Sequence, residues 1–264
     1  MPVTPFDIVK RTPKSNCGDC GYPSCLAFGV AVTTQGDDPG KCPHLNREGL
    51  QLDSSPKAGD VHQRDLELVR HLKGKIAGLD FTALAPKLGG ALSPSGAMLL
   101  SYLGRQTAVS GDGILLDGKE PEDPRDQILL YNYLAFGGGE PPAGDWIGME
   151  SMPNSISKVK TLETYCENRL ADLLDGAARE RITAAAGRAG GSLLAGGSTD
   201  LSLLVPVLPM LPLAVHFWKS EPEDGFAARV KILFDRTATG FLDIESLVFC
   251  AERMAERFEE LLAG

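Results

Sequence analysis

The stretch NCGDCGYPSC, residues 16–25, contains three of the six cysteines of this chain, and a fourth follows in GKCPH, residues 40–44. The pattern is C-x2-C-x4-C-x16-C, and its residues are Cys17, Cys20, Cys25 and Cys42. Thiols clustered in this way form disulfides, bind a zinc ion or hold an iron–sulfur cluster. Which of these applies decides how much of the function can be inferred from the sequence.

The spacing favours a cubane iron–sulfur cluster, which needs four thiolates at the corners of a tetrahedral array. Gly18 and Gly21 allow the backbone to fold tightly around such a group, and Pro43 directly after Cys42 is a neighbour also found in ferredoxin motifs. Structural zinc is the alternative, but zinc sites usually show two paired CxxC knuckles or paired histidines. His44 would be a fifth ligand, so we expect it to face solvent.

Composition narrows the range of partners and compartments. With 43% hydrophobic and 23% charged residues, the chain can bury a sizeable core, and its net charge of −9 argues against nucleic acid or an anionic membrane as partner. The N-terminus has no apolar region typical of a secretory signal, and prolines interrupt the longest apolar stretch, Leu203–Trp218. We therefore expect a cytoplasmic protein whose thiols stay reduced, which favours metal binding over disulfides.

The segment TPKSNCGDCGYPSCLAFGVAVTTQGDDPGKCP, residues 12–43, resembles the N-terminal [4Fe-4S] domain of the corrinoid iron–sulfur protein large subunit. It is also similar to the corresponding domain of Rnf-type B subunits. The resemblance implies a low-potential [4Fe-4S] cluster that passes single electrons. It also implies that the four cysteines of the motif are the cluster ligands.

The remainder of the chain is interpreted as a second domain. Residues 1–52 form the predicted cluster-binding domain, the Ser-, Pro- and Gly-rich stretch 52–60 is the predicted linker, and residues 61–264 form the larger domain. Two stretches, residues 128–153 and 206–245, resemble an uncharacterised domain family found behind such cluster modules. That family has no established activity.

Hydrophobic periodicity predicts an α+β fold, with a small, mostly helical module followed by a larger domain with antiparallel strands. Helices are expected over residues 5–11, 24–36, 61–78, 124–136, 158–176 and 244–262. Thr4, Asp123 and Asp243 are the expected caps of the first, fourth and last of these, and the first and fourth begin with a proline. Strands are expected within residues 97–116, around a turn at SGDG, and over 213–218 and 226–235. The prolines of VPVLPMLP, residues 205–212, predict a polyproline-like entry to the strand that follows.

Outside the cysteine motif, a histidine and a further cysteine are candidate functional residues. His216 and Trp218 share one face of a predicted strand, where the histidine could be an axial ligand of a corrinoid or haem. A hydrogen-bonded histidine on a half-buried sheet face is the favoured interpretation. Cys250 lies near the apolar stripe of the last helix and is expected to be a small buried hydrophobe.

Three hypotheses about function follow from the sequence. In the first, an iron–sulfur protein carries single low-potential electrons to a redox partner protein or to a cofactor held by the C-terminal domain. In the second, that domain binds a corrinoid or other tetrapyrrole whose metal the cluster reduces. In the third, the cluster only stabilises a module that docks on a partner. Whether the chain is an enzyme stays open at this stage.

Overall fold

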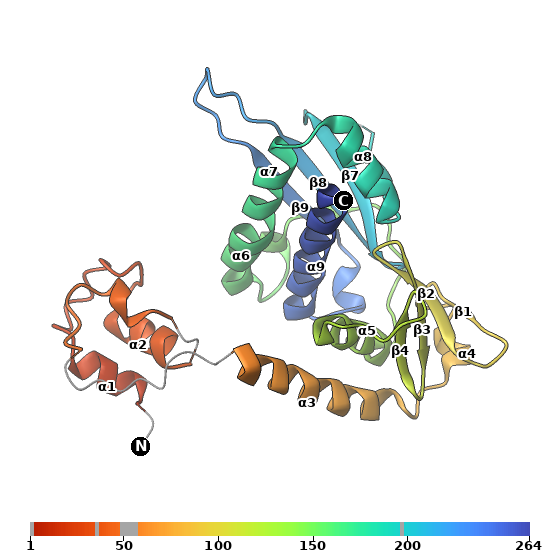
Figure 1. Ribbon diagram of the computed structural model, residues 1–264, viewed down its shortest axis with the longest axis horizontal. Helices are drawn as coiled ribbons and strands as arrows, with labels where there is room; N and C mark the ends of the chain where they lie inside the picture. Colours follow the sequence, from red (N-terminus) through yellow and green to blue (C-terminus); the bar gives the residue numbers. More distant parts are fainter. Residues whose placement is uncertain (1–2, 35–36, 48–57, 196–197) are drawn as a thin grey trace. The chain divides into compact units, whose positions relative to one another are not determined.

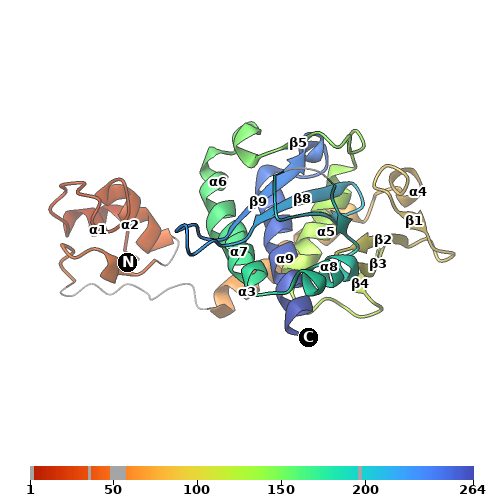
Figure 2. The same cartoon turned by 90° about the horizontal axis from the view of Figure 1, so that it is seen from above.

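The computed structural model describes residues 3–34, 37–47, 58–195 and 198–264. Contacts between Cα atoms divide the chain into an N-terminal unit, Met1–Glu67, and a C-terminal unit, Leu68–Gly264. Each unit has its own hydrophobic core and is described here by itself. Figures 1 and 2 show the elements of both.

The N-terminal unit is helical. Helix α1, Pro5–Lys10, starts after Thr4 with a proline at its first position, as the sequence predicts. The Asp7 carboxylate accepts hydrogen bonds from the Thr4 N–H (3.0 Å) and hydroxyl (2.6 Å), and the Thr4 contacts lower the pKa of Asp7 to about 2. Helix α2, Cys25–Thr34, and the short 3-10 helix η1, Pro39–Lys41, follow, and the boundary between the two units, after Glu67, falls inside helix α3, Ala58–Ile76.

The core of this unit is small. Its buried side chains are Ile8, Phe28, Val32, Cys42 and Leu45. Helices α1 and α2 pack closely, because a Cβ atom placed on Gly29 would lie only 2.6 Å from the carbonyl oxygen of Pro5. The predicted helix end at Gly36 and most of the predicted linker lie outside the described residues, and helix α3, Ala58–Ile76, begins within the last part of that linker.

The C-terminal unit contains two antiparallel sheets. The first has the order β1-β2-β3-β4 and includes the hairpin predicted around SGDG, in which Ser110 pairs with Gly113. Its strands are β1 (Ala91–Leu92), β2 (Met98–Tyr102), β3 (Arg105–Ser110) and β4 (Gly113–Leu116). Side chains of α3 and of the short helix α4, Phe81–Leu84, contribute to the core of this unit.

The second sheet has the order β5-β9-β8-β7-β6. Its strands are β5 (Trp146–Ile147), β6 (Ser192–Leu193), β7 (Leu201–Leu208), β8 (Leu211–Trp218) and β9 (Arg229–Asp235). The polyproline-like entry predicted for residues 205–212 is wrong, because these residues end β7 and begin β8. Pro206 pairs with Pro212 beside a register shift near the turn, a place where a sheet tolerates missing N–H groups.

The remaining helical elements of the C-terminal unit include one long C-terminal helix, α9 (Ile244–Ala263). The others are α5 (Pro124–Phe136), η2 (Met149–Ser151), α6 (Ile156–Leu162), the π-helical η3 (Glu163–Glu167), α7 (Asn168–Asp175), α8 (Arg179–Arg188) and η4 (Ala238–Gly240). Helix α9 contacts α5, α6, α7 and α8. The helix predicted over residues 158–176 forms as α6 through α7, with the π-helical turn inside it.

Helices α7 and α8 in turn contact the second sheet, and the buried apolar side chains of α9 belong to the same core cluster as those of the strands. The fold is α+β, as the sequence predicts. Within the described ranges, none of the helices combines the length and the apolar character needed to span a membrane.

Candidate metal centre

The four cysteines of the motif line one cavity in the N-terminal unit. All four are free thiols; Cys17 is exposed, Cys20 half-buried, and Cys25 and Cys42 buried. Three come from the loop after α1 and the first residue of α2, and Cys42 follows η1. The fold therefore brings together the residues that the sequence singles out, although Cys42 is distant from the others along the chain.

The loop that carries Cys17 and Cys20 depends on left-handed backbone geometry. Gly18 and Gly21 both have φ of +81°, and the Gly21 N–H donates to the Gly18 carbonyl oxygen at 2.8 Å. A Cβ atom at either position would meet nothing within 4 Å, so the conformation rather than space favours glycine here. Lys14 (φ 59°) and Asn16 (φ 51°) also lie in the left-handed region, which bends the loop around the cavity.

The surroundings of Cys25 favour its thiolate form. The Thr12 hydroxyl, followed by the backbone N–H of Asn16, lowers the pKa of the Cys25 thiol. Cys25 is also the first residue of α2, a helix with no acidic side chain in its first turn, so the positive end of the helix dipole is not neutralised there. The Cys25 N–H donates to Asn16 Oδ1 at 2.9 Å, which fixes this residue against the loop.

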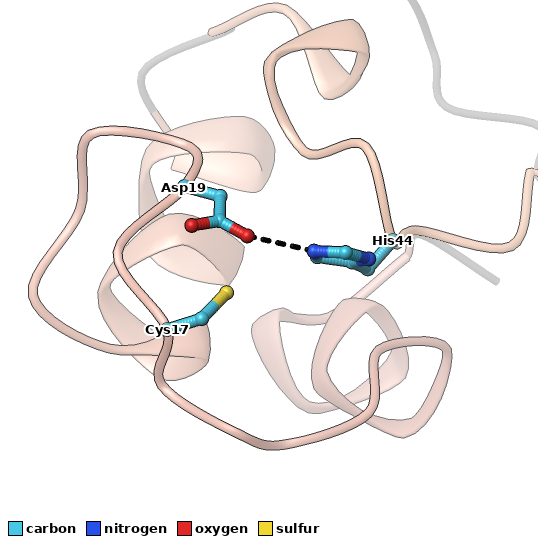
Figure 3. Close-up of side chains that lie close together, drawn as sticks. All are labelled: Cys17, Asp19 and His44. Carbon is cyan, nitrogen blue, oxygen red and sulfur yellow. Dashed lines mark hydrogen bonds and ion pairs between the residues drawn. The ribbon is translucent and has the colours of Figure 1, made fainter.

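Asp19 and His44 form a pair at the exposed side of the cavity. His44 Nε2 lies 2.8 Å from Asp19 Oδ2, and the ligand-type atoms of Cys17, Asp19 and His44 all lie within 4.8 Å of one another (Figure 3). The His44 contact, followed by Cys17, lowers the pKa of Asp19. His44 is exposed, as expected, but it also links the segment after Cys42 to the loop between Cys17 and Cys20.

A second contact network holds the segment that delivers Cys42. The Tyr22 hydroxyl donates to Asp37, and Lys41 Nζ lies 2.7 Å from Asp37 Oδ1. The Tyr22 ring packs against Phe28 of the core, with ring centroids 5.7 Å apart. Sequence reasoning missed Tyr22, Asp37, Thr12 and Asn16, because no spacing rule marks a tyrosine and an aspartate fifteen residues apart as partners.

The donor set fits an iron–sulfur cluster by its chemistry. Four sulfur donors converge on a cavity where N–H groups and a helix N-terminus favour negative charge, and thiolates with backbone donors are the usual setting of such clusters. Thiolates around a single zinc ion lie about 3.8 Å apart in tetrahedral geometry. Among the described residues, the three ligand-type atoms that lie within 4.8 Å of one another belong to Cys17, Asp19 and His44. Only one of the four cysteines is therefore in such a group.

His216 lies in β8 of the C-terminal unit. Its Nδ1 is 2.6 Å from Ser202 Oγ, its ring centroid is 6.2 Å from that of Trp218, and burial lowers its pKa. Trp218 donates from Nε1 to the Ser198 carbonyl oxygen at 2.8 Å and lies under the Arg229 guanidinium. A half-buried, hydrogen-bonded histidine is thus what the structure contains at this position, and its role as a cofactor ligand stays a prediction.

The two cysteines outside the motif are fully buried in the C-terminal unit. Burial raises the pKa of the Cys166 and Cys250 thiols, so both stay protonated at neutral pH. The expectation that Cys250 is a small buried hydrophobe agrees with its full burial in the core.

Comparison with known proteins assigns each part of the chain. The family described as "Domain of unknown function (DUF3786)" matches residues 80–257. The chain belongs to the DUF3786 family. In this DUF3786 protein, the family described as "Putative Fe-S cluster" matches residues 13–44, the segment that carries all four cysteines of the motif. No solved structure matches the chain.

Two curated relatives match the N-terminal stretch of this DUF3786 protein. The corrinoid/iron-sulfur protein large subunit of Moorella thermoacetica is 38% identical over 64 residues, which is 23% of this chain and 14% of the relative. The acetyl-CoA decarbonylase/synthase complex subunit gamma of Methanocaldococcus jannaschii is 43% identical over 44 residues, 17% of this chain and 9% of the relative. The chain thus spans a small part of either relative. The resemblance inferred from the sequence is confirmed, and the chain is an iron–sulfur protein.

Proposed function

We propose that Cys17, Cys20, Cys25 and Cys42 hold a [4Fe-4S] cluster, and that the protein carries single low-potential electrons. The convergence of the four thiols on one cavity carries this proposal. Such a cluster, when bound, accepts and releases one electron at a time. The alternative is a single zinc ion held by the same four thiols.

Each part of the site has a separate task in this proposal. Cys25 and Cys42, both buried, hold the inner side of the group, and the exposed Cys17 places the opposite side near solvent. Electron transfer to another protein needs such an exposed edge. The Asp19–His44 pair and the Tyr22–Asp37 bond position the two segments that carry the thiols.

The C-terminal domain, residues 61–264, would present the electron to a redox partner protein or to a cofactor that it binds. Residues 1–52 would form the electron-carrier domain. The fusion of an electron-carrier module to a domain whose sequence offers no catalytic motif supports this division. A cytoplasmic location, with neither nucleic acid nor a membrane as partner, belongs to the same proposal.

The test is an anaerobic ultraviolet–visible spectrum of the untagged protein, with iron, zinc and sulfide analysis on the same sample. A broad band near ~400 nm with about four irons and four sulfides is expected. Cys25→Ser should abolish or strongly alter the band, whereas the matched control Cys166→Ala, which changes a buried thiol of the other unit, should retain it. A colourless protein with one zinc would overturn the proposal and leave a metal-stabilised interaction module.

Corrinoid or tetrapyrrole binding by the C-terminal domain is a second candidate. One observation favours it: Ser202 fixes Nδ1 of His216, the arrangement in which a histidine offers its other nitrogen to a metal. Titration of the protein with hydroxocobalamin, followed by its absorption bands, tests this idea. Identical spectra for the wild type and His216→Gln would remove His216 as the axial ligand.

A further inference from the structure

Three exposed apolar side chains lie on the two helices of the N-terminal unit. Phe6 on α1 is 64% exposed, and Leu26 and Val30 on α2 are 44% and 37% exposed. Leu26 and Val30 are four residues apart and therefore share one side of α2. Gly29, between them, packs against Pro5, which precedes Phe6, so the start of α1 lies beside this part of α2. We refer to Phe6, Leu26 and Val30 as the helical apolar face.

This face borders the metal centre. Leu26 directly follows Cys25, whose thiol lines the cavity at the first residue of α2. A protein that covered Leu26 would therefore lie next to a residue that lines the metal centre. Apolar side chains that are exposed together beside a functional site often belong to an interaction surface. Single exposed apolar residues, by contrast, occur anywhere on a protein surface.

Basic residues outnumber acidic ones near the helical apolar face. Lys10 lies one turn after Phe6 and its side chain is 71% exposed. Lys14 is exposed and lies two residues before Asn16, whose Oδ1 accepts a hydrogen bond from the Cys25 N–H at 2.9 Å. Residues 3–16, which form α1 and the loop after it, contain Lys10, Arg11 and Lys14 against a single carboxylate, that of Asp7, and α2 contains no charged residue. The surface therefore suits a partner that carries uncompensated negative charge.

We propose that the helical apolar face, with Lys10 and Lys14 at its border, is the docking surface for a small acidic electron-carrier protein. This inference rests on the proposed electron-transfer function. One electron leaves the reduced carrier and enters the cluster, so the carrier is oxidised, the cluster is reduced, and no bond or proton is transferred. Apolar contact gives the complex its lifetime, and the lysines accelerate its formation.

The test compares two reductants of the cluster-loaded, full-length protein. The first is an acidic ferredoxin, reduced beforehand and mixed by stopped flow, and the second is photoreduction through neutral 5-deazariboflavin. The variants are Leu26→Gln, Phe6→Gln and Lys10→Glu. The matched controls are Leu115→Gln and Lys119→Glu in the other unit, because Leu115 is 45% exposed and Lys119 is also exposed.

We expect the rate constant with ferredoxin to fall at least ~10-fold in Lys10→Glu and Leu26→Gln, and to fall in the wild type as salt rises. Deazaflavin reduction and both control variants should stay within twofold of the wild type. Phe6→Gln, whose side chain is the most exposed of the three, should follow Leu26→Gln.

Ferredoxin rates that stay within twofold of the wild type in all three variants would overturn the docking surface, as would equal losses with both reductants. The face would then be left for this chain's own C-terminal domain or for a second copy. A wild-type cluster that deazaflavin cannot reduce would instead defeat the proposed electron-transfer function, so the two failures are distinguishable.

Discussion

The N-terminal and C-terminal units bury apolar side chains on very different scales. The described part of the N-terminal unit has five buried side chains in its core, and one of them is the thiol of Cys42. The core of the C-terminal unit extends from α3 to α9 and includes both sheets. Because this core is so small, we expect the proposed cluster to contribute to the folding of the N-terminal unit.

The two units also differ in how they treat charge. In the N-terminal unit an ion pair such as Lys10 with Asp7 lies at the surface, with both side chains exposed. In the C-terminal unit Arg253 (7% exposed) and Asp126 (3% exposed) are buried together, with Nε 2.8 Å from Oδ1, and the Tyr102 hydroxyl donates to the same carboxylate. Desolvation of the charged groups costs little for the surface pair. For the buried pair, hydrogen bonds to both charged groups have to offset that cost.

The largest expected effect is the selective unfolding of the N-terminal unit when its metal group is lost. Removing iron with a chelator, or Cys25→Ser, should leave the five-residue core without the bonds that join its two segments. Amide hydrogen exchange should show residues 25–34 losing at least ~100-fold protection, while residues 244–263 keep theirs. Because both tryptophans, Trp146 and Trp218, lie in the C-terminal unit, the fluorescence of the chain should stay native.

Equal loss of protection in the two units would contradict this contrast and show that they fold as one cooperative body. Cys250→Ala provides the opposite control, because it creates a void in the core of the C-terminal unit. It should lower the stability reported by the tryptophans and leave the metal content of the N-terminal unit unchanged.

Arg253→Met is the next largest change and acts on the C-terminal unit alone. It removes the guanidinium that donates two hydrogen bonds to the buried Asp126 carboxylate and leaves Arg105, at 3.7 Å, as its nearest cation, which costs about 3 kcal/mol. Urea unfolding followed by tryptophan fluorescence measures the loss. The double variant Arg253→Met with Asp126→Leu should recover most of it, and an equally unstable double variant would show that packing rather than the unpaired charge is responsible.

Two glycine substitutions compare the units at matched backbone geometry. Gly104 (φ +77°) and Gly21 (φ +81°) are both left-handed, but a Cβ atom on Gly104 would lie 2.0 Å from the Arg188 carbonyl oxygen, whereas one on Gly21 meets nothing within 4 Å. Gly104→Ala should cost about 3–4 kcal/mol in urea unfolding, from backbone strain plus the clash. Gly21→Ala should cost only the strain, about 1–2 kcal/mol, seen as earlier thermal bleaching of the cluster band.

Bleaching of Gly21→Ala at the wild-type temperature would show that the loop relaxes out of its left-handed turn without cost. Equal losses at the two glycines would show that the close approach of Gly104 to α8 is relieved by a small shift of the helix.

The sequence was sufficient where local signals and long-range packing agree. The caps at Thr4, Asp123 and Asp243 each precede the helix predicted from them, and the hairpin at Ser110–Gly113 forms as expected. The polyproline-like entry predicted from VPVLPMLP was wrong. The spacing of the prolines is a local signal, and the hydrogen bonds of β7 and β8 to their neighbouring strands outweigh it.

The candidate site divides in the same way. The cysteines could be found from their spacing, since thiols in such a pattern have few structural roles other than binding a metal or forming disulfides. The contacts that hold the two segments together, Tyr22 with Asp37 and Asp19 with His44, could not. They join residues 15 and 25 positions apart through a fold that no periodicity encodes.

The smallest expected effect is the pH dependence contributed by His216. Burial lowers its pKa in the folded protein below the ordinary value of 6.5, so the unfolded chain binds a proton more readily than the folded one. Stability is therefore complete above about pH 6.5 and falls as the pH drops through the lowered pKa. His216→Gln removes this titration, so between pH 7.5 and pH 5 the wild type should lose more stability than the variant, by about 0.5 kcal/mol or less because the ring is only half-buried. Urea unfolding at the two pH values, followed by circular dichroism because Trp218 adjoins the histidine, measures the difference. A larger loss in the variant would mean that the Ser202 contact stabilises protonated His216 and would reverse the sign.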